Sequence, residues 1–203
     1  MTQQASARRR GRPRSAARTS DLDPREEILR HAADLFSARG LGATRVSDIA
    51  ASVDVSPGAI YYHFDNLDAI AEQLLTYVVE ESAAFATAAA RGDGSSAARL
   101  RSLVAQHVER LTSGPYDLWF VAGLSDADGE RFPVVGRHAS RWRRAVTTLV
   151  GEGVAAGELP EIDADLAVAL VSGLVYGALE VRHRGGAVDG SEIADRALAA
   201  LGF

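Results

Sequence analysis

Apolar residues recur with the spacing of an α-helix along nearly the whole chain, and this periodicity most constrains the fold. In residues 24–39, for example, Ile28, Ala32 and Phe36 fall on one helical face, and Gly40 then provides a stop. No segment of useful length shows the two-residue alternation of a half-buried strand. The sequence therefore predicts an all-α protein with about nine helices.

Short runs of Gly, Pro, Ser and Asp separate the periodic segments and set the expected boundaries. The helices expected after the first cover about residues 45–53, 57–63, 66–90, 97–113, 117–124, 131–156, 163–183 and 191–202. We expect three parts along the chain: a disordered arm at 1–22, a small three-helix domain at 23–70 and a larger helical domain at 71–203.

The expected arm differs sharply in charge from the rest of the chain. Residues 1–20 contain six Arg and no acidic residue, whereas the whole chain has a net charge of -5. A basic tail on an acidic body is typical of a segment that meets an anionic partner. Arg10, Gly11 and Arg12 resemble the core of an AT-hook, which lies in the minor groove of A·T-rich DNA. The alternative is a solubilising tail with no binding role.

Composition excludes several classes of protein. The chain has no Cys, so disulfides, thiolate metal sites and cysteine nucleophiles are absent. No apolar run follows the charged N-terminus, as a secretory signal would require. The longest nearly uncharged stretch, Leu166–Leu179, is shorter than the roughly 20 residues that cross a bilayer, so we expect a buried helix there. These features predict a cytoplasmic protein without a membrane partner.

One rival interpretation is an enzyme with a metal centre. Glu180 and His183 have the acid-to-histidine spacing of di-iron helical bundles. Such centres need a second pair and further carboxylates, and the other histidines supply no second Glu-x-x-His. No Ser/His/Asp arrangement or phosphate-binding loop is evident either. We therefore expect a protein that is not an enzyme and has no catalytic residues, metal ligands or cofactor.

Two short helices, expected at residues 45–53 and 57–63, are joined by a tight turn at Asp54 and Val55, which predicts a helix-turn-helix. In such a motif the second helix lies in the major groove of DNA with its first residues near the base edges. The start of this helix consists of small residues, so its backbone can approach DNA closely: Ser56, Pro57, Gly58 and Ala59. Its end offers hydrogen-bonding groups to phosphates or bases: Tyr61, Tyr62 and His63.

This segment resembles the TetR family of bacterial regulators over about residues 24–75. The matching residues include Ile49-Ala50, Val55-Ser56 and, above all, the run Gly-Ala-Ile-Tyr-Tyr-His-Phe from Gly58 to Phe64. The resemblance implies that the following residues contact DNA: Arg45, Ser47, Ser56, Gly58, Ala59, Tyr61, Tyr62 and His63. Two positions depart from the family pattern: Asp54 stands where Gly is preferred, and Leu67 stands where a Lys usually follows the Phe.

The resemblance also implies a two-fold dimer that reads a pseudo-palindromic double-stranded operator, with residues 71–203 forming a ligand-binding and dimerisation domain. Several side chains in this region are candidates for lining an apolar cavity: His107, Trp119, Phe120, Trp142 and Tyr176. The alternative is that these side chains are ordinary core residues with no role in ligand binding. Gly173 and Gly177, four residues apart on one expected helix, imply close approach of another backbone, which we assign to the dimer interface. The alternative is tight packing within one protomer.

The function implied by the resemblance is that of a repressor, released from its operator when an unknown small, largely apolar molecule binds the larger domain. Such release requires that the ligand bind one of two conformations more tightly than the other. A second rival is a sequence-independent DNA coat that uses the basic arm. The acidic body disfavours this alternative, because proteins that coat DNA are usually basic throughout.

Overall fold

A computed structural model of the chain describes residues 22–124 and 126–203. Within these ranges every regular element is helical, so the predicted all-α class is confirmed. The α-helices are α1 (Pro24–Arg39), α2 (Val46–Ser52), α3 (Pro57–His63), α4 (Leu67–Arg91), α5 (Ser96–Thr112), α6 (Asp126–Arg131), α7 (Pro133–Ala155), α8 (Ala164–His183) and α9 (Gly190–Leu201). Two 3₁₀ turns, η1 (Leu41–Ala43) and η2 (Trp119–Gly123), complete the elements of the described residues.

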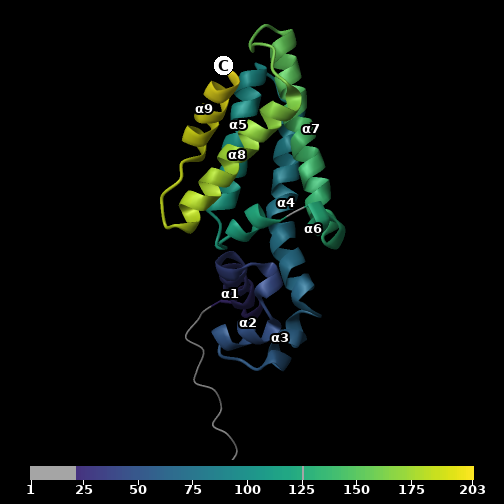
Figure 1. Cartoon of the computed structure of the whole chain (residues 1–203), viewed down its shortest axis with the longest axis vertical. Helices are drawn as coiled ribbons and strands as arrows, with labels where there is room; N and C mark the ends of the chain where they lie inside the picture. Colours follow the sequence, from purple (N-terminus) through teal and green to yellow (C-terminus); the bar gives the residue numbers. More distant parts are fainter. Residues whose placement is uncertain (1–21, 125) are drawn as a thin grey trace, which may run out of the picture.

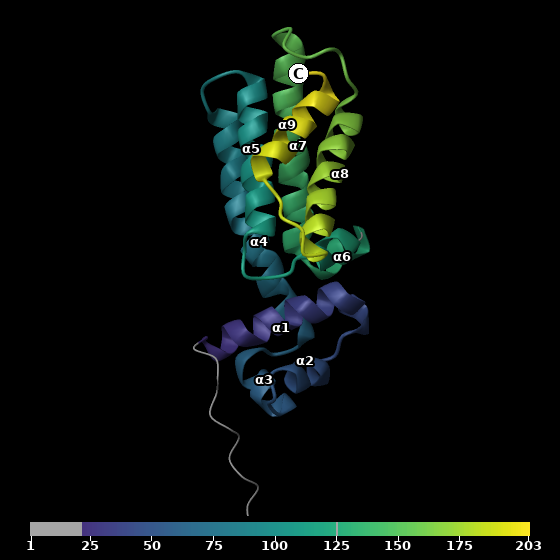
Figure 2. The same cartoon turned by 90° about the vertical axis from the view of Figure 1, so that its left-hand side faces the viewer.

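The helices form two packed groups that share one long helix (Figures 1 and 2). α1, α2 and α3 pack together at one end of the molecule, and α5, α7, α8 and α9 form a bundle at the other. α4 starts beside α3 and runs into the bundle, where it lies against α5 and α7. Its 25 residues give a length of about 37 Å, since each residue of an α-helix adds about 1.5 Å. One continuous helix therefore connects the two groups.

Side-chain caps define where several helices begin. Asp23 accepts a hydrogen bond from the Arg25 amide at 2.7 Å, and Asn66 accepts one from the Ala69 amide at 2.8 Å. Asp163 caps α8 in the same way. Because capping side chains are local signals in the sequence, the starts of α1, α4 and α8 agree closely with the expected boundaries.

Two residues of types that are common at helix N-caps do not cap the helices that follow them here. Thr44 does not cap α2, since its hydroxyl donates to the Gly40 carbonyl at 2.9 Å instead. The cap of α2 lies one residue later, where the Asp48 carboxylate accepts from the Arg45 amide at 3.0 Å. Ser56 stands just before α3, but its hydroxyl makes no capping hydrogen bond. The short α3 therefore depends on the packing of its buried residues more than on a cap.

The region between α5 and α7 differs from the expectation. Residues 117–124, expected as an α-helix, contain only the 3₁₀ turn η2. Residues 126–129, expected as a break, belong to the short helix α6, and the next long helix begins at Pro133. Proline lacks an amide hydrogen and restricts the residue before it, so it favours a new helix start over continuation of the helix before it.

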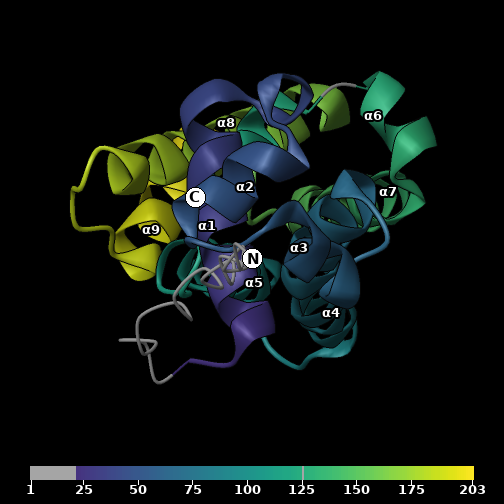
Figure 3. The same ribbon diagram turned by 90° about the horizontal axis from the view of Figure 1, so that it is seen from below.

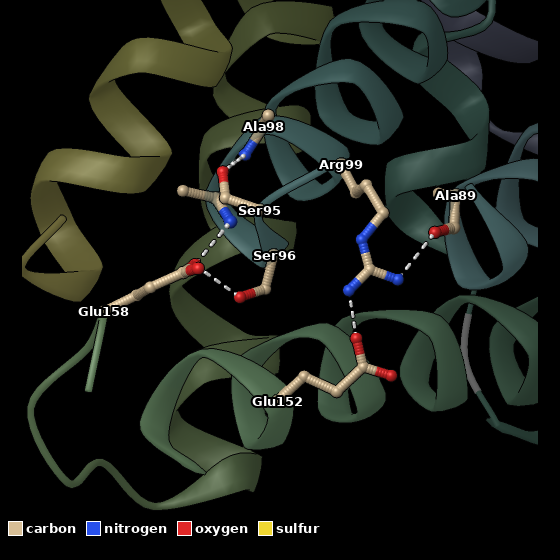
Figure 4. Close-up of polar contacts among 8 residues, drawn as sticks. Ala89, Ser95, Ser96, Ala98, Arg99, Glu152 and Glu158 are labelled. Carbon is tan, nitrogen blue, oxygen red and sulfur yellow. Dashed lines mark hydrogen bonds and ion pairs between the residues drawn. The ribbon is translucent and has the colours of Figure 1, made fainter. Parts of the chain in front are cut away.

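Polar contacts stabilise the end of the bundle that lies away from α1, α2 and α3. They join α5 to α7 and to the turn after α7 (Figure 4). The Glu158 carboxylate accepts from the Ser96 hydroxyl at 2.6 Å and from the Ala97 amide at 3.3 Å. The Ser96 hydrogen bond holds the pKa of Glu158 below its usual value. Arg99, also on α5, pairs with Glu152 on α7. These contacts fix the bundle at the end opposite to α1, α2 and α3.

Candidate DNA-binding surface and ligand cavity

The turn between α2 and α3 adopts a left-handed backbone conformation at Asp54, with a φ of 53°. Asp tolerates this region better than most residues that carry a Cβ, so the departure from Gly leaves the turn intact. Ile49 on α2 and Ile60 on α3 are fully buried, and Phe64 closes α3 against the same core. The two helices are therefore held in a fixed mutual orientation, which confirms the expected helix-turn-helix.

α3 presents large aromatic side chains to solvent. Tyr62 is 86% exposed and Tyr61 is 55% exposed, although side chains of this size are mostly covered in folded proteins. The His63 ring packs edge-on against Tyr62, with the ring centroids 5.1 Å apart. The described part of the chain leaves these side chains uncovered, so they are free to contact a partner.

The first turn of α3 leaves room for close approach. Gly58 is exposed, and a Cβ built there would meet only the Ser56 hydroxyl, at 3.8 Å. The other residues expected to contact DNA are exposed or half-buried on the three-helix group, which Figure 3 shows from below: Arg45, Ser47, Ser56, Pro57, Ala59, Tyr61, Tyr62 and His63. Arg10, Gly11 and Arg12 of the arm lie outside the described residues, so their role in the minor groove stays a prediction.

Positive charge on this surface is sparse. Arg39 pairs with Asp48 at 3.6 Å, whereas the exposed Arg45 makes no ion pair with any described residue. An unpaired guanidinium beside the helix-turn-helix suits a contact with a DNA phosphate. The remaining contacts from this surface would come from hydroxyl, imidazole and backbone groups.

A cavity of about 290 Å³ lies within the bundle. Side chains from α4, α5, α7, α8 and the η2 segment line it, and many of them are Leu and Val. Three of the residues expected at a ligand site are among them: His107, Trp142 and Tyr176. A larger groove of about 560 Å³ beside Tyr77 is more open to solvent, so it would enclose an apolar ligand less completely. We therefore take the cavity within the bundle as the candidate ligand site.

Trp119 and Phe120, also expected at the ligand site, lie outside the cavity. Phe120 packs edge-on against Phe36 of α1, with the ring centroids 5.5 Å apart, and its amide donates to the Ser37 hydroxyl at 3.1 Å. Trp119 stacks on the His183 ring of α8. Both were candidates because of their aromatic residue type, but the 3₁₀ turn directs the Phe120 ring to α1 and the Trp119 ring to α8.

Sequence reasoning missed two residues near His107, the part of the cavity here called its polar end: His138 lines the cavity, and Ser82 contacts His107 without lining it. His138 lines the cavity four residues before Trp142 on the same face of α7, a spacing that is readable in the sequence. Ser82 of α4 is buried, and its hydroxyl oxygen lies 2.9 Å from the Nδ1 of His107. The His107 ring packs against the rings of Trp142 and His138, at centroid distances of 4.5 and 5.3 Å. Burial lowers the pKa of His107 to about 3 and, with help from nearby Arg141, that of His138 to about 4.

Acid is expected to destabilise the fold through these imidazoles. His107, with a pKa of about 3 when folded and about 6.5 when unfolded, stabilises the protein above pH 6.5, and this contribution is lost as the pH falls from 6.5 towards 3. At pH 5 the free energy of unfolding is lower by about 2 kcal/mol. This pH lies about 1.5 units below the pKa of the unfolded state, and each unit is worth about 1.4 kcal/mol. Denaturant unfolding at pH 7.5 and pH 5 measures it for wild type and His107→Phe. We expect the free energy of unfolding to fall more between these pH values for wild type than for the variant. An equal fall in both proteins would contradict a neutral, buried His107.

Glu180 and His183 do not converge on a metal site. Glu180 pairs with Arg184 at 2.6 Å, and the Nδ1 of His183 lies 2.6 Å from a carboxylate oxygen of Asp117. Among residues 22–124 and 126–203, no group of three or more His, Asp or Glu side chains is arranged to hold a metal ion. The two side chains therefore make separate local polar contacts.

α8 is less buried than its sequence indicates. It is the one described helix long and apolar enough to cross a membrane, with a mean hydropathy of 1.6, yet only 28% of that window is buried inside the protomer. Its exposed side carries a row of apolar residues, here called the α8 stripe: Leu166, Ala169, Gly173, Tyr176, Gly177 and Val181. A Cβ built at Gly173 or Gly177 would meet no described atom within 4 Å, so neither glycine serves close packing within the protomer. The expectation of a buried helix is therefore wrong for a single protomer.

Comparison with known proteins adds sequence and structural relatives. Residues 28–74 match the family described as bacterial regulatory proteins, tetR family. Over 180 residues the chain is 27% identical to the HTH-type transcriptional repressor KstR2 of Rhodococcus jostii (strain RHA1), which covers 86% of this chain and 87% of that protein. The crystal structure of Mycobacterium smegmatis AmtR has 28% identity and a TM-score of 0.69 over 94% of this chain and 98% of that one. FadR from Bacillus subtilis, solved in complex with stearoyl-CoA, shares the fold at 19% identity with a TM-score of 0.62 over 87% of this chain and 96% of that one.

A helix-turn-helix exposed at one end and a helical bundle with an apolar cavity at the other define the class of this protein, a transcriptional regulator that binds DNA. The match to the family covers the same helices that carry the exposed Tyr61 and Tyr62. Residues 28–74 therefore match the TetR family of bacterial regulators, as the run from Gly58 to Phe64 implied.

Proposed function

We propose that the protein is a homodimeric, cytoplasmic repressor that binds a pseudo-palindromic operator and is released by a small, largely apolar ligand. The course of α4 is the observation that carries this proposal. Its first turn follows α3, and three of its later residues, Leu75, Val78 and Val79, line the cavity. A ligand that displaces α4 within the bundle would therefore also move the helix that supports α3.

A second set of contacts joins the cavity to the DNA-binding end. Val121 in η2 lines the cavity, while the neighbouring Phe120 packs on Phe36 of α1. The Ser37 hydroxyl of α1 donates to the Asp117 carbonyl at 3.1 Å. A ligand shifts such contacts only if it binds more tightly to the conformation that does not fit DNA. The apolar lining of the cavity supports a largely apolar ligand.

The α8 stripe supports a two-fold dimer. Monomeric proteins rarely expose a continuous apolar surface along a helix, and a second copy of this chain would cover it. In a two-fold dimer the α3 helices of the two protomers would enter successive major grooves on one side of the duplex. The operator would then be a pseudo-palindrome with half-sites about one helical turn apart.

Selection of bound DNA from a pool of random duplexes tests this function, with the full-length protein at physiological salt. We expect a pseudo-palindromic motif in which the two half-sites are separated by about one helical turn. Recovery of no motif, or only of A·T-rich DNA without symmetry, would contradict the proposal and assign DNA binding to the Arg-rich residues 1–22. Release is then measured as the loss of binding to the selected operator when apolar compounds are added.

A further inference from the structure

The polar end of the cavity has a defined arrangement of hydrogen-bond donors and acceptors. The Ser82 hydroxyl donates its single hydrogen to the Val78 carbonyl at 2.7 Å. The same oxygen lies 2.9 Å from the Nδ1 of His107, so it accepts there, and the His107 proton sits on Nδ1. The Nε2 of His107 then carries a lone pair and makes no hydrogen bond with any described residue. This free acceptor belongs to a side chain that is 5% exposed and lines the cavity.

His138 supplies the complementary group. Its Nδ1 is buried and has no hydrogen-bond partner among the described residues. A buried N–H without a partner is rarer than a buried acceptor without one, so we place the His138 proton on Nε2. His138 also lines the cavity, and its ring centroid lies 5.3 Å from that of His107. The two neighbouring rings that line this end of the cavity therefore carry one free acceptor and one donor.

We propose that the ligand of this cavity is an uncharged amphiphile with a hydroxyl group, an alcohol or a phenol, that donates to the Nε2 of His107. This inference rests on the proposed function only in taking the cavity as the ligand site. A hydroxyl can donate to His107 and accept from His138 at once, whereas an ether or a ketone can only accept and an ammonium can only donate. The apolar part of the ligand lies among the Leu and Val side chains.

Charged ligands fit the cavity less well. No acidic side chain of the described residues lines it, so an ammonium group would be buried without a counter-ion. Arg143 lines the cavity, but its guanidinium pairs with Asp165, so a ligand carboxylate would have to compete with this exposed ion pair. A hydroxyl avoids the desolvation cost that either charge would bring.

Calorimetric binding of three matched probes to the full-length protein tests the assignment: 4-butylphenol, 4-butylanisole and butylbenzene. The phenol donates and accepts, the anisole only accepts, and the hydrocarbon does neither. We expect the Kd of the phenol to be about tenfold lower than that of the anisole, as one additional buried hydrogen bond would give, and lower still than that of the hydrocarbon. In His107→Phe the preference of the phenol over the anisole should disappear, because both can still accept a hydrogen bond from His138. His183→Phe, the same change outside the cavity, should keep it.

Ser82→Ala is a second variant in case His107→Phe does not fold, because it removes only the hydroxyl that fixes the His107 proton on Nδ1. We expect it to reduce the preference for the phenol. Equal binding or no binding of the three probes to wild type would overturn the proposal, as would a preference that survives in both variants. No DNA is present in these measurements, so their outcome is separate from whether a ligand releases the operator.

Discussion

Replacing Gly58 by glutamate is expected to weaken operator binding by about 100-fold, a change of about 3 kcal/mol, while leaving the fold intact. A Cβ at Gly58 meets only the Ser56 hydroxyl, at 3.8 Å, so the longer side chain has room in the free protein. A carboxylate in the first turn of a helix is also favourable in the folded state. Against DNA, the same carboxylate lies beside phosphates, and juxtaposed like charges cost several kcal/mol. Fluorescence anisotropy with the selected operator measures the loss.

Gly58→Gln is the matched control, because glutamine has nearly the shape of glutamate without its charge. We expect it to lose less than about tenfold in affinity. The gap between the two variants should narrow as salt is added, since salt screens the repulsion between the carboxylate and the phosphates. Equal losses at all salt concentrations would mean that bulk rather than charge matters at this position. Wild-type affinity in both variants would exclude α3 as the helix that contacts DNA.

The helix-turn-helix was predictable from the sequence because its determinants are local. Pro57 at the first helical position, small residues after it, and the buried Ile60 and Phe64 all belong to one short segment. The cap at Asn66 is equally local, since its side chain bonds to an amide three residues along the chain. Signals of this kind do not depend on which distant helices pack against the segment. The exposure of Tyr62 then follows, because α3 turns its other face to the core.

The cavity was predictable only in part, because its lining depends on how distant helices pack. His107 and Trp142 come from α5 and α7, and their approach to Ser82 of α4 is set by helix packing that no local pattern reports. Trp119 has a suitable residue type for a ligand site, yet the 3₁₀ turn directs its ring to His183. α8 shows a related limit. Its apolar sequence predicts burial, but it does not tell whether the same protomer or a second one covers the helix.

Replacing Gly173 by arginine is expected to prevent formation of the proposed dimer and to leave a monomer. Gly173 lies within the α8 stripe, and no described atom of the protomer lies within 4 Å of a Cβ built there, so the arginine fits the isolated fold. In a dimer that uses this stripe, the same side chain would bring an unpaired charge into an apolar interface, at a cost of several kcal/mol. Sedimentation velocity at micromolar concentration measures the change in mass.

Gly151→Arg is the matched control, since Gly151 is also an exposed helical glycine with nothing within 4 Å of its Cβ position, but it lies on α7. We expect this variant to remain dimeric. Operator affinity should fall by more than about 100-fold for Gly173→Arg alone, because two linked half-site contacts bind far more tightly than one. A Gly173→Arg protein that stays dimeric would place the interface away from the α8 stripe. A monomer that keeps wild-type affinity would instead mean that each protomer binds its half-site independently. Dimerisation through α8 would then not be needed for operator binding.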